Sequence, residues 1–316
     1  MTKYATVGPR KAALALAALA VAGLVAGCGS STPATSARPA TSASAFPVTV
    51  GGVTLSQRPT HIVSLTPTGT EMLFAIGAGS QVAAVDDQSN YPAGVPKTNL
   101  SGYQPDAEAI AAKSPDLVVI SEDINDIKQQ LTKLKVPVYV MPAAATLNDS
   151  YTELTDLGRL TDHQSQAANA VTQMKDGIAS LVKDVPKRTK PLTYYYELDQ
   201  TYYSATSKTF IGSLFSMVGL TNIADPADTD GKAGGYPQLS AESIVKANPD
   251  LIFLADTKCC QQSASTVAAR PGWSGLSAVR DGRVVALDDD IASRWGPRVV
   301  NLVKDITDAV EKVPAS

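Results

Sequence analysis

Short apolar runs alternate with amphipathic stretches from about residue 61 onward, and the repeated order is strand, turn, helix. The first of these runs is Ile62-Val63-Ser64-Leu65. The alternation is typical of βαβ units and predicts an α/β fold with parallel sheets. Ahead of it, residues 48–55 hold two β-prone runs on either side of Gly51-Gly52, which predicts a hairpin.

One pattern occurs twice in the chain, 134 positions apart. Glu108-Ala109-Ile110 is followed by Ser114-Pro115-Asp116-Leu117, and Glu242-Ser243-Ile244 is followed by Asn248-Pro249-Asp250-Leu251. In each copy we expect a helix to end before the proline, which cannot continue it, and a buried strand to follow. The separation exceeds the roughly 20–50 residues of a solenoid repeat. The sequence therefore predicts two similar lobes.

A single long helical pattern lies between the two copies. From about Ser165 to Val185, apolar residues recur at spacings of three and four, and Pro186 ends the pattern. A helix of about 20 residues is about 30 Å long, enough to join two lobes, although the same pattern suits a surface helix within one domain. We expect an N-terminal lobe at 48–163, a linking helix at 164–186 and a C-terminal lobe at 187–316.

The N-terminus has the layout of a secretory signal. Basic residues precede an apolar run at 12–27, which is shorter than the roughly 20 residues of a membrane-spanning helix. The run ends in Val25-Ala26-Gly27-Cys28, which resembles a bacterial lipobox, so we expect a signal peptide at 1–27 and acyl chains on Cys28. Residues 28–47, rich in Ser, Thr, Ala and Pro, are predicted to be a tether. The alternative is a soluble secreted protein in which Cys28 is incidental.

The charge and the histidine content of the chain argue against several classes of function. The full chain has a formal charge of −3, and residues 28–316 hold 24 basic against 30 acidic residues. Without a basic cluster we expect no nucleic-acid partner, and contact with the membrane only through the lipid. His61 and His163 are the only histidines, too few for a histidine-rich metal site or a catalytic triad. We expect no cofactor and no enzymatic activity; an extracytoplasmic α/β hydrolase and a free-metal receptor for Zn or Mn are the alternatives.

Several short motifs between about residues 58 and 312 together resemble class III solute-binding proteins of ABC importers, most closely the members that bind vitamin B12. The motifs are Arg58-Pro59, Ile62-Val63-Ser64-Leu65, Glu71, Asn90-Tyr91-Pro92, the two Pro-Asp-Leu repeats, the linking helix and Arg294-Trp295-Gly296-Pro297-Arg298. The resemblance implies two α/β lobes bridged by one rigid helix, with a corrinoid, ferric siderophore or haem in the cleft. It also implies a monomer on the outer face of the cell membrane that delivers its ligand to an ABC permease with its ATPase.

The resemblance also implies which residues bind the ligand. In the C-terminal lobe, Tyr203, Tyr236, Asp290 and Arg294 match cleft positions of the family, although Asp290 and Arg294 could equally form an ion pair within one helix. In the N-terminal lobe, Gln88 and either Gly102 or Tyr103 stand where the B12-binding members have aromatic rings. The N-terminal wall is therefore expected to be more polar. By strand alternation, at least one side of Tyr194-Tyr195-Tyr196 is expected to be core.

A surface glutamate on each lobe docks into permease arginines in that family, and the matching positions here are Glu108 and Glu242. This agrees with the internal repeat, which places one carboxylate at an equivalent position on each half. The alternative is a pair of solvated glutamates at helix starts, favoured by the helix dipole.

Two adjacent cysteines, Cys259 and Cys260, follow the second buried strand of the repeat. Outside the cytoplasm paired thiols tend to oxidise, yet a trans peptide holds adjacent Cα atoms about 3.8 Å apart, closer than the usual ~4.4–6.8 Å of a disulfide. A vicinal disulfide is therefore strained. A thiolate metal site and a pair of reduced thiols are the alternatives.

Overall fold

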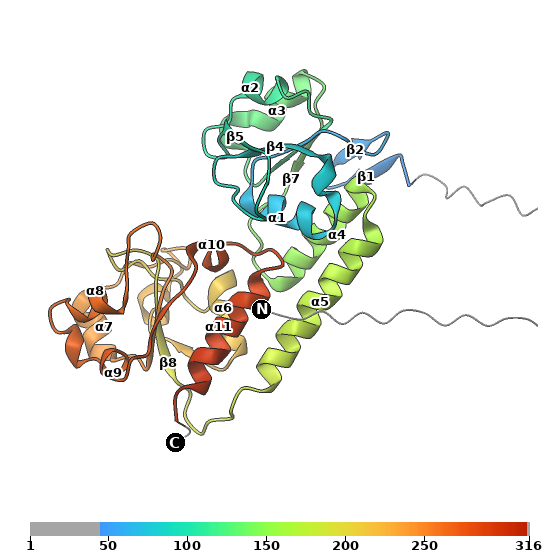
Figure 1. Cartoon of the computed structure of the whole chain (residues 1–316). Coiled ribbons are helices and arrows are strands. Elements are labelled where there is room, and N and C mark those ends of the chain that lie inside the picture. Colours follow the sequence, from blue (N-terminus) through green and yellow to red (C-terminus); the bar gives the residue numbers. More distant parts are fainter. Residues whose placement is uncertain (1–44, 315–316) are drawn as a thin grey trace, which may run out of the picture. The chain divides into compact units, whose positions relative to one another are not determined.

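A computed structural model describes residues 45–314 of the chain. The predicted signal peptide, Cys28 and almost all of the predicted tether lie outside the described residues. The described part forms two α/β lobes, each with a parallel sheet (Figure 1), which confirms the predicted fold class. No helix between residues 45 and 314 is both long enough and apolar enough to cross a membrane.

The N-terminal lobe is built on a five-stranded parallel sheet. Its strands lie in the order β5 (Lys97–Leu100), β4 (Val82–Asp86), β3 (Ile62–Ser64), β6 (Leu117–Ile120) and β7 (Val138–Val140). The helical segments of this lobe are α1 (Pro67–Ala75), η1 (Ala78–Gln81), α2 (Ala107–Ala111), η2 (Ile124–Asp126), α3 (Ile127–Lys133) and α4 (Leu147–Thr161). The predicted hairpin is confirmed as β1 (Val48–Val50) and β2 (Val53–Leu55), with positive φ at both glycines of its turn.

The C-terminal lobe is built on a four-stranded parallel sheet. Its strands lie in the order β11 (Val284–Ala286), β10 (Leu251–Leu254), β8 (Thr193–Glu197) and β9 (Thr221–Asn222). Its helical segments are α6 (Phe210–Met217), η3 (Asp225–Asp228), α7 (Ala241–Ala247), α8 (Ala264–Ala268), η4 (Trp273–Gly275), α9 (Ser277–Arg280), α10 (Asp289–Ala292) and α11 (Val299–Glu311). In both sheets the chain order reverses beside a central strand, and the carboxyl ends of strands at such a point form a ligand crevice in open α/β folds.

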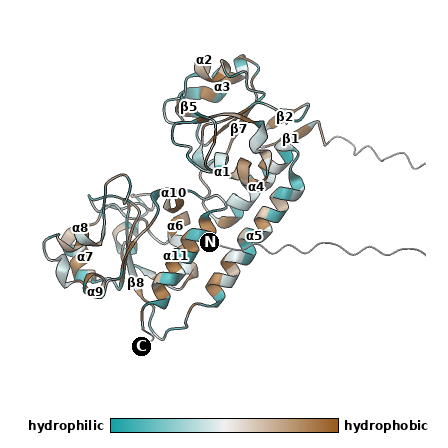
Figure 2. Ribbon diagram, viewed as in Figure 1, coloured by the Kyte–Doolittle hydropathy of each residue, from teal (hydrophilic) through white to brown (hydrophobic). Residues whose placement is uncertain are grey.

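The helix α5 (Gln164–Lys183) connects the two lobes in the chain and contacts both. It packs against α4 of the N-terminal lobe and against α11 of the C-terminal lobe (Figure 1). Met174 and Ile178 of the predicted apolar face are buried, and Val171 and Leu181 pack at its edge. Figure 2 shows hydrophobic and hydrophilic positions alternating along this helix, as expected for a helix with one buried face.

The internal repeat performs the same structural task in both lobes. The Asp116 carboxylate accepts hydrogen bonds from the backbone N–H groups of Thr60 (2.6 Å) and His61 (2.9 Å), at the start of β3. The Asp250 carboxylate accepts hydrogen bonds from the backbone N–H (2.8 Å) and hydroxyl (3.0 Å) of Thr193, at the start of β8. Each aspartate thus satisfies donors at the amino end of the neighbouring strand and fixes the register of its sheet.

Candidate functional site

A cavity of about 380 Å³ lies where the two lobes meet. Ala143 and Ala144, which follow β7, form its N-terminal wall. The C-terminal wall consists of residues that end or follow β8, β10 and β11 together with residues of α6, α10 and nearby loops: Tyr196, Leu198, Phe210, Ile211, Tyr236, Ala255, Cys259, Asp289, Ala292, Ser293, Arg294 and Trp295. The cavity therefore lies at the carboxyl ends of the strands, where ligands bind in parallel α/β sheets.

Aromatic side chains supply much of the cavity wall. Tyr236, one of the predicted ligand residues, lines the cavity and is 46% exposed. Tyr196 is buried, and its hydroxyl donates to the carbonyl oxygen of Ala292 at 3.1 Å. Burial raises the pKa of the Tyr196 phenol well above its ordinary value, so the group stays neutral.

Strand alternation in Tyr194-Tyr195-Tyr196 is confirmed. Tyr194 and Tyr196 join the large core that contains Phe215, whereas Tyr195 joins a separate cluster with Trp273. Tyr196, the second-last residue of β8, also lines the cavity. The spacing of the three tyrosines predicted which of them share a face of the strand. It did not predict which face borders the cavity.

Arg294 lies in the cavity wall, 8% exposed, and both of its Nη groups already donate hydrogen bonds to the protein. Its Nη1 donates to Glu71 Oε1 (2.7 Å) and Asn90 Oδ1 (2.9 Å), and its Nη2 donates to Asp290 Oδ1 (2.8 Å). Nη2 also donates to the backbone carbonyl of Gln88 at 3.2 Å. Gln88 thus contacts Arg294 through its backbone rather than through the side chain that the sequence analysis had singled out.

Glu71 receives a second guanidinium group from the same segment. Arg298 Nε donates to Glu71 Oε2 at 2.8 Å, and Arg298 Nη2 pairs with Glu71 Oε1. The guanidinium of Arg298 also lies over the ring of Tyr91, 4.3 Å from its centroid. We call Glu71, Arg294 and Arg298 the interlobe clamp, because a buried carboxylate on α1 is held by two cations of the C-terminal lobe. Buried charges of this kind are stable only when they are paired and hydrogen-bonded.

Trp295, between the two arginines, is anchored to the N-terminal lobe as well. Its Nε1 donates to Glu153 Oε2 at 2.7 Å, and its backbone carbonyl accepts a hydrogen bond from Ser150 Oγ at 2.5 Å. Both partners lie on α4. Burial raises the pKa of Glu153 to about 7, against the opposing effect of the Trp295 hydrogen bond. Arg294, which was predicted to bind the ligand, therefore lies in a segment that joins the two lobes through several polar contacts.

Of the six predicted ligand residues, only Tyr236 and Arg294 line the cavity; Gln88, Tyr103, Tyr203 and Asp290 lie outside its lining. Tyr103 follows β5 and is 76% exposed, and Tyr203, in the loop after β8, is 41% exposed. Tyr203 pairs with Gln238 through an isolated β-bridge, close in sequence to Tyr236. Asp290 is one residue beyond the cavity residue Asp289 and bonds to Arg294.

The two candidate docking glutamates occupy equivalent positions. Glu108 is the second residue of α2 and Glu242 the second residue of α7. Both are exposed, and neither carboxylate has an ion-pair partner within residues 45–314. Each helix precedes the strand of the repeat, so the two lobes present their glutamates in the same structural context.

The cysteine loop follows β10 and reaches the cavity through Cys259. Cys259 is exposed, Cys260 is half-buried, and both are free thiols in this structure. Desolvation and the neighbouring Cys260 thiol raise the pKa of Cys259 to about 12. The loop is held in place by Asp289, whose carboxylate accepts from the backbone N–H groups of Thr257, Lys258 and Cys259 at 2.9–3.0 Å.

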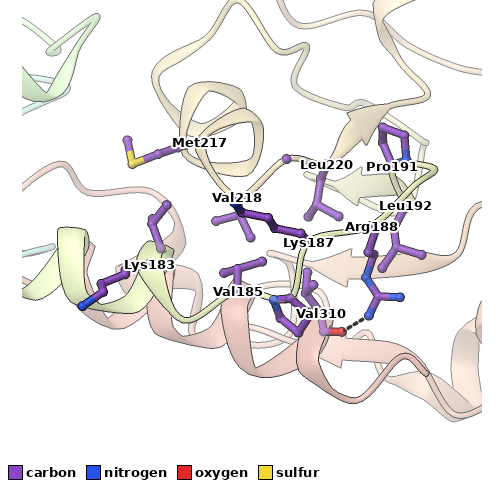
Figure 3. A pocket seen from close by; sticks show the side chains of 13 residues that line it. Lys183, Val185, Lys187, Arg188, Pro191, Leu192, Met217, Val218, Leu220 and Val310 are labelled. Carbon is purple, nitrogen blue, oxygen red and sulfur yellow. Dashed lines mark hydrogen bonds between the residues drawn. The ribbon is translucent and has the colours of Figure 1, made fainter. Parts of the chain in front are cut away.

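A second, larger cavity of about 510 Å³ lies away from these residues, at the carboxyl end of α5 (Figure 3). Aliphatic side chains such as Val185, Leu220 and Met217 line most of it. Its Arg188 donates to the carbonyl oxygens of Val310 (2.9 Å) and Pro314 (2.8 Å), at and beyond the end of α11. None of the predicted ligand residues lines this cavity.

Neither histidine contributes to the cavity between the lobes. His163 is buried, with Nδ1 2.9 Å from the carbonyl oxygen of Thr161, and His61 lies beside Thr60. In the described part of the chain, no group of three or more His, Cys, Asp or Glu residues is arranged to hold a metal ion.

Two α/β lobes with a cavity between them are an architecture that solute-binding proteins share. Residues 62–291 match the periplasmic binding protein family, and the chain belongs to that family. It is 28% identical over 319 residues to the uncharacterized ABC transporter substrate-binding lipoprotein YvrC of Bacillus subtilis, covering 95% of this chain and 97% of that protein. It is 29% identical over 307 residues to the cobalamin-binding protein of Halobacterium salinarum, covering 92% and 82% of the two chains.

Solved structures show the same fold. A possible iron-binding periplasmic solute-binding protein of Staphylococcus epidermidis matches with a TM-score of 0.68 and 27% identity, over 80% of this chain and 99% of that one. The periplasmic vitamin B12 binding protein of Vibrio cholerae matches with a TM-score of 0.65 and 22% identity, over 80% and 96% of the two chains. Thus the family assignment from sequence is confirmed.

Replacing the clamp carboxylate tests its role. We expect Glu71→Gln to lower the free energy of unfolding by about 3–5 kcal/mol, because the buried guanidinium of Arg294 and the half-buried one of Arg298 lose their shared counter-charge. The measurement is the urea unfolding midpoint. Asp308→Asn, which breaks the exposed pair of Lys304 and Asp308, is the control and should move the midpoint little. Equal midpoints for the two variants would contradict the assignment of the clamp.

Glu153 gives the fold a pH dependence. Its pKa is about 7 when folded against 4.5 ordinarily, so the folded state binds more protons than the unfolded state between these values. Stability from this group is therefore fully present below about pH 4.5 and is lost as the pH rises to about 7.

We expect Glu153→Gln, which keeps an acceptor for Trp295, to remove that loss. From pH 5 to pH 8 the variant should gain on the order of 2 kcal/mol of stability relative to the parent protein. Denaturant unfolding at both pH values measures it, with the exposed Glu122→Gln as control. A parent–variant difference that is the same at pH 5 and pH 8 would rule out the effect.

Proposed function

We propose that this chain is the lipid-anchored, extracytoplasmic receptor of an ABC importer and that it delivers a corrinoid or an iron chelate to the permease and its ATPase. The observation that carries the proposal is the cavity between the lobes, at the carboxyl ends of strands from both sheets and walled by aromatic side chains. The lipoprotein relative in Bacillus subtilis supports the anchor, which we place on Cys28.

The chemistry of the cavity favours a corrinoid among these ligands. The charged groups in its lining, Arg294 and Asp289, are both bonded to the protein. The wall therefore offers no free positive charge to a multiply anionic ferric catecholate. Tyr236, Phe210 and Trp295 offer broad apolar contact instead, which suits a large macrocycle. The cobalamin-binding and vitamin B12-binding relatives support the same choice.

A corrinoid would extend beyond the cavity. The volume of about 380 Å³ holds only part of a corrin ring with its side chains. The exposed rings of Tyr103 and Tyr203 stand at the carboxyl edges of the two sheets, where they can contact the part of the ligand outside. We therefore assign Tyr236 to the inner wall, and Tyr103 and Tyr203 to the rim. Gln88, through its backbone carbonyl, and Asp290 both accept hydrogen bonds from Arg294 Nη2 and orient it.

A ligand titration tests this function. We expect cobalamin or cobinamide, from a panel that also holds haem, a ferric hydroxamate and a ferric catecholate, to bind and raise the melting temperature. Tyr236→Ala should weaken binding about 5- to 30-fold through the loss of one aromatic contact. Met217→Ala, an exposed apolar side chain in the other cavity, is the matched control. Failure of every compound in the panel to bind would overturn the proposal.

The docking role of Glu108 and Glu242 has a separate test. In proteoliposomes that hold the cognate permease and ATPase, Glu108→Ala and Glu242→Ala should each reduce the stimulation of ATP hydrolysis about fivefold or more, because each removes one charge from the contact. Ligand affinity should not change, since both side chains are remote from the cavity lining. Glu311→Ala, exposed at the end of α11, is the control. Full stimulation by the double variant would refute docking through these residues.

A further inference from the structure

The cysteine loop connects the cavity to the interlobe clamp. Lys258 Nζ pairs with Asp288 and with Asp290, each at 2.8 Å. Asp290 in turn accepts from Arg294 (2.8 Å) and from Asn90 Nδ2 of the N-terminal lobe (3.0 Å). A continuous chain of charged contacts therefore runs from the residue before Cys259 to the clamp.

The backbone of the same loop is fixed by few contacts. The carboxylate of Asp289 holds three consecutive N–H groups, the last of which belongs to Cys259. The N–H groups of Cys260 and Gln262 both donate to the carbonyl oxygen of Asp256, at 3.2 and 3.3 Å. The N–H group of the peptide between Cys259 and Cys260 is the one that Cys260 donates to Asp256. A change in that peptide would therefore disturb this hydrogen bond and would shift Cys259, whose own N–H bonds to Asp289 in the cavity wall.

We propose that Cys259 and Cys260 form a reversible dithiol–disulfide pair in the cavity wall, and that the reduced pair holds the loop in its ligand-binding form. The two thiols belong to adjacent residues, are accessible and interact with each other. A disulfide between neighbouring residues is strained, and strained disulfides have the more oxidising potentials of labile rather than structural bonds. The pair is therefore suited to switching.

The reaction is thiol–disulfide exchange with a small disulfide such as oxidised glutathione. One cysteine thiolate attacks the disulfide to form a mixed disulfide and releases one thiol. The second cysteine then attacks its neighbour's sulfur and releases the other thiol. Two electrons pass from the protein to the small disulfide, and the two cysteine protons end on the released thiols.

The loop itself provides a readout that needs no ligand. Closing the ring turns the 259–260 peptide, so the N–H group of Cys260 should leave the carbonyl oxygen of Asp256, and the backbone amide of Cys260 should exchange hydrogen faster in the oxidised protein. Affinity provides the second readout and rests on the proposed function. The loss of about one hydrogen bond that orders the wall should weaken corrinoid binding about three- to tenfold on oxidation.

The experiment equilibrates the full chain with oxidised or reduced glutathione and alkylates it without reductant. The tryptic peptide that begins at Cys259 should carry no label after oxidation and two labels after reduction. Hydrogen exchange and cobinamide affinity are then measured on both forms, with the double variant Cys259→Ser/Cys260→Ser as the control that should not respond to glutathione. Cys28 does not interfere, because the labels are counted on one peptide.

Two labels after oxidation would overturn the proposal, as would a disulfide that leaves both hydrogen exchange and affinity unchanged. If no corrinoid binds in either state, the proposed ligand is wrong. A faster amide exchange that appears only in the oxidised parent protein would then still establish the switch.

Discussion

Two guanidinium groups of the C-terminal lobe share one carboxylate of the N-terminal lobe, and this contact decides how the lobes meet. Glu71 is 3% exposed, and Arg294 and Arg298 approach it from a segment more than 220 positions later in the chain. Removing the Glu71 carboxylate, or the two arginines, would leave a buried charge uncompensated, at a cost of several kcal/mol. Trp295 lies between the two arginines in the sequence. Its hydrogen bonds with Glu153 and Ser150 of α4 also join the C-terminal lobe to the N-terminal lobe.

This arrangement gives Arg294 two tasks. It forms part of the cavity wall while all its described bonds are to protein groups. A ligand with a carboxylate or amide could bond to the Nη groups of Arg294 only by displacing one of these bonds, so contact with those groups would loosen the junction. A ligand held by apolar contact with Tyr236 and Trp295 would leave the bonds between the lobes intact. An apolar wall is therefore compatible with a stable junction.

Local patterns in the sequence predicted the local structure. The α/β class, the hairpin at Gly51-Gly52 and the apolar face of α5 follow from spacing and turn chemistry over a few residues, and all appear in the structure. The partners of Arg294 could be predicted only in part: Asp290 lies four positions away, whereas Glu71 and Asn90 come from the other lobe. Gln88 contributes its backbone carbonyl, which every residue type has, so the identity of the residue does not predict this contact. Contacts of this kind join residues that are far apart in the sequence. Local spacing does not show which distant segments the fold brings together.

The largest buried apolar cluster runs through both lobes without interruption. It joins Met72 and Leu154 of the N-terminal lobe to Phe215 and Leu302 of the C-terminal lobe, with Met174 of α5 between them. The repeat suggests two modules, but a cut at α5 would leave each half with an incomplete interior. Residues 45–314 should therefore melt in a single cooperative transition, and neither half should persist as an independent folding unit.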